Sequence, residues 1–372
     1  MSTLALVGGQ YGSEGKGVIA ARLAHRSTLA VRTGGPNAGH SLNHEGRVWK
    51  MRSVPCAWVN PKCKLVIGPG AVIDPEVLAA EVEALEDAGY KIIKRLWIDE
   101  NATIISQADR HRERGGRGWQ AYGHPPITER ISSTGEGVGE ARMRKIRRDD
   151  SEWAGAGDVL EAFGVGNTLP LINTHALTGR VLLEGTQGYG LSLHHGAWPY
   201  VTSANCTAAQ LASDAGLGIH PDISFGALVV FRSFPIRVGG PSGPLKGELT
   251  WDDISERVGA HTIEHTTVTG KVRRIGEFDW DMSKEAIMVN GAIAQALTFA
   301  DYIDPAVTGE TRFEYLTKPV RAFIDKMEDE HGVPVQFIGT GGPIWSLVER
   351  PHPALHSWGS GEREDHAVAP IS

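Results

Sequence analysis

The 372-residue sequence has only three cysteines, Cys56, Cys63 and Cys206. They form neither a Cys-x-x-Cys metal pattern nor a disulfide framework, which fits a reducing compartment. No apolar run approaches about eighteen residues, and the chain does not open with the basic, apolar and small-residue series of a secretory signal. We therefore expect a cytoplasmic protein that does not cross or bind a membrane.

The sequence also lacks an excess of positive charge. Its formal net charge of −7 at pH 7 argues against a general nucleic-acid binder, because such binding depends on neutralising many phosphates. Basic residues gather locally, in 110–118 and 143–148. We interpret the first cluster as a solvated turn rather than a mobile functional loop. The second follows the hydroxyl- and glycine-rich stretch 132–139, and the pair suits a phosphate monoester.

A strict phosphate-loop pattern is missing too, although residues 8–17 come close to one. They hold five glycines and follow the apolar run 4–7, so backbone N–H groups can converge on an anion beside Lys16. Five residues rather than four separate Gly9 from Gly15, and Gly17 stands where the strict pattern has the magnesium-binding Ser or Thr. We predict a variant phosphate cradle whose metal is held by another group.

Short apolar runs with a glycine at or next to one end predict buried strands of a mainly parallel sheet. They are residues 4–7, 64–68, 180–185, 226–231 and 334–339. Helical patterns lie between them, at 73–89, with Asp74 as cap and Pro75 in the first turn, and at 315–331. We predict an α/β fold with a large, mainly parallel central sheet flanked by helices.

Six blocks in a fixed order make the sequence recognisable. They are Gly-Gly-Gln-Tyr-Gly-Ser-Glu-Gly-Lys-Gly (8–17), Arg-Thr-Gly-Gly-Pro-Asn-Ala-Gly-His (32–40), Ser-Ser-Thr-Gly-Glu-Gly-Val-Gly (132–139), Glu-Gly-Thr-Gln-Gly (184–188) with Pro-Tyr-Val-Thr-Ser-Ala-Asn (199–205), Arg-Val-Gly-Gly-Pro (237–241) and Val-Thr-Gly-Lys-Val-Arg-Arg-Ile-Gly (268–276). Together they resemble the adenylosuccinate synthetase family. The resemblance implies one domain over 1–350 with inserted active-site loops, followed by a loose tail over 351–372.

The resemblance implies a carbon–nitrogen ligase. Such enzymes phosphorylate the 6-oxygen of a purine monophosphate with a nucleoside triphosphate, and aspartate then displaces the phosphate through its amino group. This chemistry needs a triphosphate cradle, Mg²⁺, an acid or hydrogen-bond donor at the transferring oxygen, and a cationic pocket for a dicarboxylate.

Family positions assign the candidate residues. The implied catalytic residues are Ser13, Lys16, His40 and Gln187, with His40 as the acid or donor at the 6-oxygen. The implied metal positions are Ser13 and the Gly39 carbonyl. The implied triphosphate site consists of Gly12, Glu14, Gly15, Lys16, Gly17, Gly39, His40, Ser41, Phe299, Asp301, Gly339 and Gly341. The implied monophosphate site consists of Ser13, Asn37, Thr134, Arg148, Gln187, Thr202 and Gly239.

The aspartate pocket falls on Val268, Thr269, Lys271 and Arg273. Lys271 stands where the family usually has arginine, which weakens a bidentate carboxylate clamp. Arg273 and Arg274 still suit a dicarboxylate, and a solvated basic turn is the alternative. The resemblance also places Arg148, or its neighbour Arg147, in the active site of a second subunit, so we expect a homodimer.

Position 13 departs from the family pattern. The resemblance implies an aspartate there, which removes the N1 proton of inosine monophosphate and helps to hold magnesium. Ser13 does neither well, because a hydroxyl has no useful basicity near neutral pH. A small neutral side chain instead leaves room for a purine 2-amino group. The combination resembles phage-type 2-aminoadenylosuccinate synthetases, which join aspartate to dGMP, and the short chain fits them as well.

The segment that reads the triphosphate base departs from the pattern too. The family has Thr-Lys-x-Asp, whereas this chain has Thr298-Phe299-Ala300-Asp301. Phe299 breaks the guanine signature, so we expect ATP or dATP. Asp301 leaves GTP open, and Phe299 also fits a residue that packs on any base.

Three functions follow, and the first is preferred. It is an ATP- or dATP-driven ligase that makes N6-succino-2-amino-2'-deoxyadenylate from dGMP and aspartate for diaminopurine DNA, in a host cytoplasm if phage-encoded. The second is an ordinary adenylosuccinate synthetase that uses IMP and GTP. The third is a catalytically silent nucleotide sensor, which the intact transfer residues argue against. None of the three binds nucleic acid directly.

Overall fold

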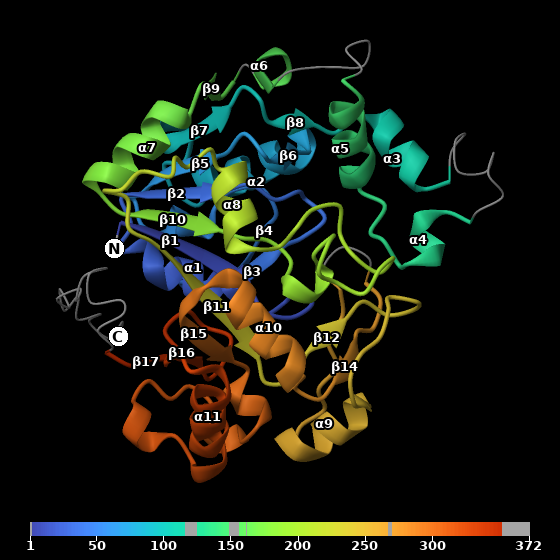
Figure 1. Cartoon of the computed structure of the whole chain (residues 1–372), viewed down its shortest axis with the longest axis vertical. Coiled ribbons are helices and arrows are strands. Elements are labelled where there is room, and N and C mark those ends of the chain that lie inside the picture. Colours follow the sequence, from blue (N-terminus) through green and yellow to red (C-terminus); the bar gives the residue numbers. More distant parts are fainter. Residues whose placement is uncertain (1, 116–124, 149–155, 161, 267–269, 352–372) are drawn as a thin grey trace.

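The computed structural model describes residues 2–115, 125–148, 156–160, 162–266 and 270–351. A ten-stranded sheet crosses the middle of the molecule (Figure 1). In spatial order its strands are β17 (Leu347–Glu349), β16 (Val335–Gly339), β15 (Ala292–Thr298), β11 (Phe225–Arg232), β1 (Thr3–Gly8), β10 (Val181–Glu184), β2 (Leu29–Arg32), β5 (Lys64–Ile67), β7 (Leu96–Asp99) and β9 (Gly164–Gly166).

The strands pair in parallel, apart from β17, which is antiparallel to β16. The five predicted apolar runs form β1, β5, β10, β11 and β16, so the predicted fold class is confirmed. Alternate residues of β1 face two separate apolar clusters. Leu4 and Leu6 belong to one cluster, and Ala5 and Val7 belong to the other. Both faces are covered, which explains why the strands are apolar throughout.

Some of the described helices cover the two faces of the sheet. The described helices are α1 (Lys16–Ala24), α2 (Pro75–Asp87), α3 (Gln107–Glu113), α4 (Ile127–Arg130), α5 (Val138–Arg147), α6 (Ala156–Val159), α7 (Leu169–Thr178), α8 (Ala208–Asp214), α9 (Trp251–Val258), α10 (Trp280–Asn290) and α11 (Lys318–His331). Side chains of α1 and α2 pack in the cluster of Leu4, whereas those of α7, α8, α10 and α11 pack in the cluster of Val7.

The two predicted helices are present, with one shifted start. In α2 the Asp74 side chain accepts hydrogen bonds from the first-turn N–H groups, as expected of a cap. The helix predicted from residue 315 starts at Lys318, because Thr317 is the extended N-cap and Pro319 occupies the first turn. Leu316, just before the helix, is still buried in the same cluster as the α11 side chains.

Three small sheets complete the described fold. The hairpin of β3 (His40–His44) and β4 (Arg47–Met51) follows β2, and β6 (Val72–Ile73) pairs with β8 (Thr103–Ile104). The third sheet has the order β12 (Ile236–Arg237), β14 (Arg274–Gly276) and β13 (Glu248–Leu249). Among the described helices, none is long and apolar enough to cross a membrane. The predicted tail lies outside the described residues from position 352 onward.

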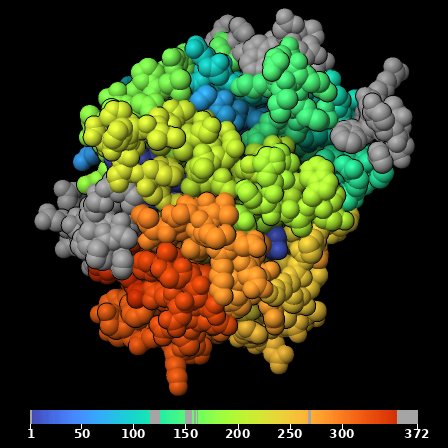
Figure 2. Space-filling model, in the orientation of Figure 1, coloured from blue at the N-terminus to red at the C-terminus, as the bar shows by residue number. Residues whose placement is uncertain are grey.

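Parallel strands end along one edge of the sheet, and ligands of open α/β folds bind there. β1, β2, β10, β11 and β15 bring loop 9–15, Arg32, Glu184, Arg232 and Thr298 to this edge. Figure 1 shows α3, α4 and α5 at the upper right and α9 with β12 and β14 at the lower right, with the loops after β10 between them. In Figure 2, a small dark-blue area of the N-terminal segment shows between the lime-green and gold segments.

Candidate active site

The loop between β1 and α1 is organised by the buried side chain of Glu14. Its carboxylate accepts hydrogen bonds from the N–H groups of Gln10 (3.1 Å) and Gly12 (2.8 Å). The Lys16 ammonium lies 2.5 Å from the other carboxylate oxygen and also donates to the carbonyl of Gln187. Gly12 and Gly15 have φ values of 87° and 79°, which glycine adopts without steric cost. The loop is therefore a preformed cradle with a fixed cation.

A cavity of ≈ 500 Å³ opens above this loop. All the residues predicted for the triphosphate site line it except Gly12. They come from the N-terminal loop, from β3 and from the ends of β15 and β16, which are far apart in the sequence. The structure therefore brings the predicted triphosphate residues together.

A second cavity of ≈ 190 Å³ lies between the α4–α5 segment and the loops after β10 and β12. Of the residues predicted for the monophosphate site, Asn37, Thr134, Gln187 and Thr202 line it. Ser13 lines the larger cavity instead.

Two predicted monophosphate residues lie elsewhere. Arg148 ends α5 as an exposed C-cap residue. Gly239 permits a close backbone approach, since a Cβ atom there would lie 2.2 Å from the Val272 carbonyl oxygen.

Arg237 and Tyr11 are among the side chains of the smaller cavity that were not predicted. The guanidinium of Arg237 stacks on the ring of Tyr11 at 4.3 Å from its centroid and donates to the carbonyls of Tyr200 (2.9 Å) and Pro244 (3.2 Å). Both stacked residues line the cavity. They lie within recognised blocks, but block positions alone do not show which side chains face a ligand.

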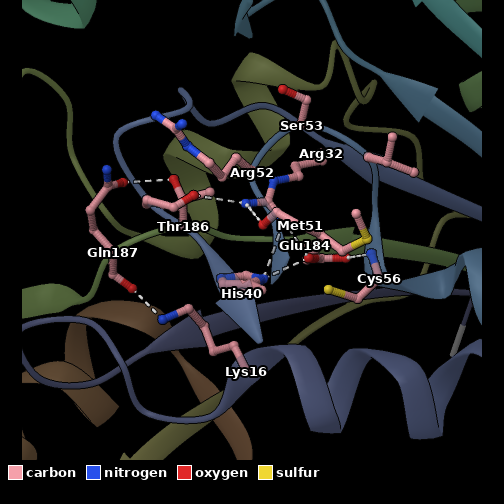
Figure 3. Close-up of polar contacts among 12 residues, drawn as sticks. Lys16, Arg32, His40, Met51, Arg52, Ser53, Cys56, Glu184, Thr186 and Gln187 are labelled. Carbon is pink, nitrogen blue, oxygen red and sulfur yellow. Dashed lines mark hydrogen bonds and ion pairs between the residues drawn. The ribbon is translucent and has the colours of Figure 1, made fainter. Parts of the chain in front are cut away.

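Gln187 joins the two cavities. Its carbonyl accepts from Lys16 at the larger cavity, and its side chain donates to Asn37 Oδ1 (3.3 Å) at the smaller one. Thr186 donates to its Oε1 at 2.6 Å (Figure 3). The residue has φ 49°, an uncommon value for a side-chain-bearing residue. Such backbone strain is frequent at functional sites, where the surrounding contacts hold it.

His40 is part of a buried charged network (Figure 3). Its Nδ1 lies 2.6 Å from Glu184 Oε1, and the same carboxylate accepts from Arg32 (2.8 Å) and from the Cys56 N–H (2.7 Å). Burial and the nearby Arg32 charge lower the pKa of His40 to about 4. Burial raises the pKa of Glu184, but the hydrogen bond from His40 and the charge of Arg32 outweigh it and lower that pKa to about 2. At neutral pH the pair is therefore a carboxylate and a neutral imidazole.

This arrangement determines which His40 nitrogen could meet a ligand. The Nδ1–H donates to Glu184, which leaves Nε2 without a hydrogen-bond partner among the described residues although it is buried. His40 lines the triphosphate cavity. A nearby anionic phosphoryl group would favour protonation of Nε2, because an opposite charge stabilises the imidazolium. Glu184 lies in a recognised block, but its role became visible only with its distance to His40.

Ser13 contacts the predicted aspartate loop. Arg273 donates to its Oγ at 2.6 Å, and Arg232 donates to its carbonyl at 3.3 Å. Ser13 has φ 59°, a conformation in which Asp and Asn are several-fold enriched among residues other than glycine. The serine therefore keeps the backbone shape that suits an acidic residue, but it meets Arg273 as a neutral hydrogen-bond acceptor.

Arg232 connects three parts of the larger cavity. It is fully buried, ion-pairs with Glu264 at 2.5 Å and stacks on the ring of Phe299 at 3.8 Å from its centroid. Tyr302 donates to the same Glu264 carboxylate (3.1 Å). Asp301 Oδ1 is buried without a partner among the described residues, and burial raises the pKa of this carboxyl. Arg232 and Glu264 were not predicted, because neither has a local sequence signal.

The predicted aspartate residues are only partly described. Val268 and Thr269 lie outside the described residues. Lys271 is exposed, whereas Arg273 lines the triphosphate cavity. Arg274 turns away from the cavities, because it pairs with Glu248 at 2.7 Å and donates to the Gly243 carbonyl at 2.8 Å.

The predicted metal positions both line the larger cavity. The Gly39 carbonyl suits Mg²⁺, which prefers oxygen ligands and takes few of them from protein when it is bound by phosphates. Ser13 Oγ fits less well, since Arg273 already donates to it. His40, Cys56 and Glu184 form the described cluster of potential metal ligands, but Glu184 pairs with Arg32 and burial keeps the pKa of the Cys56 thiol well above its usual value.

A model of the adenylosuccinate synthetase family matches residues 5–160 and 150–308. The chain belongs to this family. It is 38% identical to adenylosuccinate synthetase of Methanococcus aeolicus over 353 residues, which are 94% of this chain and 99% of that protein. It is 36% identical to the enzyme of Pyrococcus horikoshii over 356 residues, with the same coverage. The protein is thus an adenylosuccinate synthetase-type ligase, and this family uses a nucleoside triphosphate and Mg²⁺.

Two solved structures are similar to this adenylosuccinate synthetase-family chain. The cyanophage S-2L succinoaminodeoxyadenylate synthetase (PurZ), bound to dGMP and dATP, has a TM-score of 0.78 and 29% identity, and covers 96% of this chain and 98% of that one. Fully ligated adenylosuccinate synthetase from Plasmodium falciparum has a TM-score of 0.77 and 20% identity, and covers 94% and 100%. The second likeness concerns the fold alone.

The buried His40 predicts acid sensitivity. The pKa of His40 in the folded protein is about 4, below the ordinary value near 6.5. Between these two pH values His40 is protonated in the unfolded chain but neutral in the folded chain. Stability from this group is complete above pH 6.5 and falls as the pH drops toward 4, by about 3 kcal/mol in total. Urea unfolding of wild type between pH 7 and 4 should show this loss.

The variant His40→Asn should lose stability less steeply over the same range. His331, whose pKa burial also lowers to about 4, stays in the variant and keeps part of the slope. The exposed His261→Asn is the control and should retain the wild-type slope. Equal slopes for wild type and His40→Asn would contradict a neutral buried imidazole.

Proposed function

We propose that this ligase condenses aspartate with dGMP and uses ATP or dATP as the phosphoryl donor. The observation that carries the proposal is Ser13, which stands where the family has aspartate and whose Oγ accepts from Arg273 at 2.6 Å. An aspartate there would pair with Arg273 and place a second acceptor group beside the N1 and C2 side of the purine. Serine occupies less volume and keeps a hydroxyl oxygen that can accept from a purine 2-amino group, so the room gained favours a purine with that group.

Two comparisons bear on this choice. The structurally similar cyanophage protein was solved with dGMP and dATP, which supports the proposal. The archaeal relatives at 36–38% identity are named adenylosuccinate synthetase, which favours IMP. Chain length does not separate the two activities, because this chain spans 99% of the archaeal relatives. The short chain fits the cyanophage protein, 98% of which it covers, as well as it fits the archaeal relatives, so Ser13 carries the argument.

The proposed reaction has two steps. In the first, the bond between the γ-phosphorus and its bridging oxygen breaks and the purine 6-oxygen takes the phosphoryl group, while the N1 proton passes to water or to a phosphate oxygen of the substrates rather than to Ser13. Lys16 and the loop N–H groups stabilise the transferring charge, and His40 Nε2 donates to the oxygen. In the second, the aspartate amino group forms a bond to C6 as the bond from C6 to the phosphorylated oxygen breaks, and the departing phosphate takes up the amine proton. Arg273, next to Ser13, is placed to bind an aspartate carboxylate near C6.

IMP with GTP is a second candidate because of Asp301. Its unpartnered Oδ1 lies in the triphosphate cavity, where a carboxylate suits the N1–H and N2–H donors of guanine. Phe299 opposes this candidate, because its ring replaces the lysine of the family signature and one face of it is covered by Arg232. Because the Arg232 guanidinium covers one face of the Phe299 ring, the other face is left to stack on a base, either adenine or guanine.

A substrate panel tests the proposal. Wild type should succinylate dGMP with ATP or dATP and use IMP at least about tenfold less well by kcat/KM, which corresponds to about 1.4 kcal/mol. Product is scored by chromatography for dGMP, GMP and IMP, each with ATP, dATP and GTP. Efficient turnover of IMP with little use of dGMP would refute the proposal.

Substitution at Ser13 tests the residue that carries it. Ser13→Asp should lower kcat/KM for dGMP by about tenfold or more, because the new carboxylate pairs with Arg273 and crowds the 2-amino group. Ser13→Asn is the matched control. Asparagine has nearly the same shape as the aspartate of Ser13→Asp and tolerates the left-handed backbone, but it adds no charge. Equal dGMP use by Ser13→Asp and wild type would remove Ser13 from the explanation.

We also propose that the enzyme is a homodimer in which Arg148 completes the site of the partner subunit. Its exposed place at the end of α5 supports this role. His40→Asn and Arg148→Ala should each be nearly inactive, whereas an equal mixture after subunit exchange should regain about a quarter of wild-type activity. Half of the dimers are then hybrids, and each hybrid has one intact site. No recovery despite hybrid formation would show that Arg148 does not act across the interface.

A further inference from the structure

The carboxylate of Glu113 occupies the positive end of helix α5. It is buried at the end of α3, and its two oxygens accept from the N–H groups of Gly137 (2.7 Å), Gly139 (2.7 Å) and Glu140 (3.4 Å). These groups belong to the N-cap and the first turn of α5, where N–H groups have no partner within the helix. An internal anion therefore binds where helix geometry favours a negative charge.

This contact shows what the backbone of the glycine-rich stretch 132–139 binds in the folded protein. The sequence suggested that its backbone would hold a phosphate, but Glu113 already takes two of its N–H groups, those of Gly137 and Gly139, and the N–H of Glu140 that follows. The glycines serve this contact. A Cβ atom at Gly139 would lie 3.0 Å from Glu113 Oε1, and Gly137 has φ 86°. The side chain of Thr134 is left to meet the substrate phosphate.

Neighbouring contacts hold the same loop. Arg114, which follows Glu113, donates from Nε to the Gly135 carbonyl at 2.8 Å. Glu136 accepts from Arg52 at 2.7 Å. Consecutive residues of the α3 end thus bind N–H groups and a carbonyl of one loop. The loop keeps its shape without a bound nucleotide.

Glu113 and Thr134 line the same ≈ 190 Å³ cavity. A carboxylate beside a dianionic phosphate would repel it if it were free. Here burial raises the pKa of Glu113, the first-turn N–H groups and the helix dipole offset part of that cost, and the contacts order the loop. A phosphate that meets a preordered loop loses less conformational entropy on binding.

We propose that Glu113 is a positioning residue for the monophosphate substrate: its carboxylate holds loop 132–139 so that Thr134 faces the nucleotide phosphate. This inference rests on the proposed monophosphate cavity, but it does not depend on which purine is used. It differs from a purely structural anchor in one respect. Loss of the carboxylate should weaken monophosphate binding specifically, while the triphosphate site, which is built from other segments, is unaffected.

The test uses the full-length enzyme and whichever monophosphate and triphosphate wild type turns over. Glu113→Ala leaves three buried N–H groups unpartnered, and the loop should lose its shape. KM for the monophosphate should rise about tenfold or more, while kcat and KM for the triphosphate stay within about twofold. Glu113→Gln should show a smaller rise in the monophosphate KM. Its one side-chain oxygen still accepts hydrogen bonds from the backbone N–H groups of α5, whereas its amide N–H₂ group cannot accept them. Glu83→Ala, an exposed change on α2, should match wild type in all three constants.

Chemical rescue distinguishes positioning from loss of folding. The alanine variant leaves an empty, cavity-facing anion site, so sodium formate or acetate should lower its monophosphate KM toward the wild-type value. Sodium chloride at equal ionic strength should not, and neither salt should affect wild type in this way. A monophosphate KM within twofold of wild type in Glu113→Ala would overturn the proposal, whatever happens to the melting temperature.

If the alanine variant does not fold, Glu113→Gln decides, and an unchanged monophosphate KM in that variant would also overturn the proposal. A wild-type enzyme that turns over IMP rather than dGMP would refute the proposed substrate and leave this test intact. The two inferences therefore fail separately.

Discussion

Hydrogen bonds from backbone N–H groups to the buried Glu14 carboxylate hold the loop between β1 and α1, and the two cavities depend on that loop. The carboxylate also receives the Lys16 ammonium, which ties the loop to the Gln187 carbonyl. Gln187 in turn contacts Asn37 in the smaller cavity. One internal anion thereby fixes the cation of the triphosphate site and the residue shared with the monophosphate site.

The same physical solution recurs around the substrates. Glu184 binds His40 and Arg32, Glu264 binds Arg232, and Glu113 binds the start of α5. A site for two phosphorylated substrates must concentrate cations and N–H donors, which would repel one another or stay unpaired in an empty enzyme. Internal carboxylates offset that charge and hold the donors in place. Their cost is burial, which each one offsets through several short hydrogen bonds.

Much of the fold could be predicted from sequence, because its signals are local. Apolar runs predicted five central strands, and Asp74 with Pro75 predicted the start of α2. The start of the helix at Lys318 was missed by three residues, since apolar spacing continues through Leu316 although the backbone there is extended. The site was predicted by resemblance rather than by pattern, and the structure brings most of the predicted triphosphate residues to one cavity. Arg274, Gly239 and the glycines of 132–139 turned out to serve the protein's own packing.

The sequence by itself determined the family, through six short blocks in a fixed order. It also determined the phosphate cradle and the unusual serine at position 13, because both are carried by residues close together in the chain. Only the tertiary structure decided what those residues contact. Ser13 meets Arg273 and Glu113 meets Gly137 through side chains brought together by separate strands and helices, and no local spacing encodes such distances. Pairing over long sequence separations depends on how the whole sheet and its helices pack.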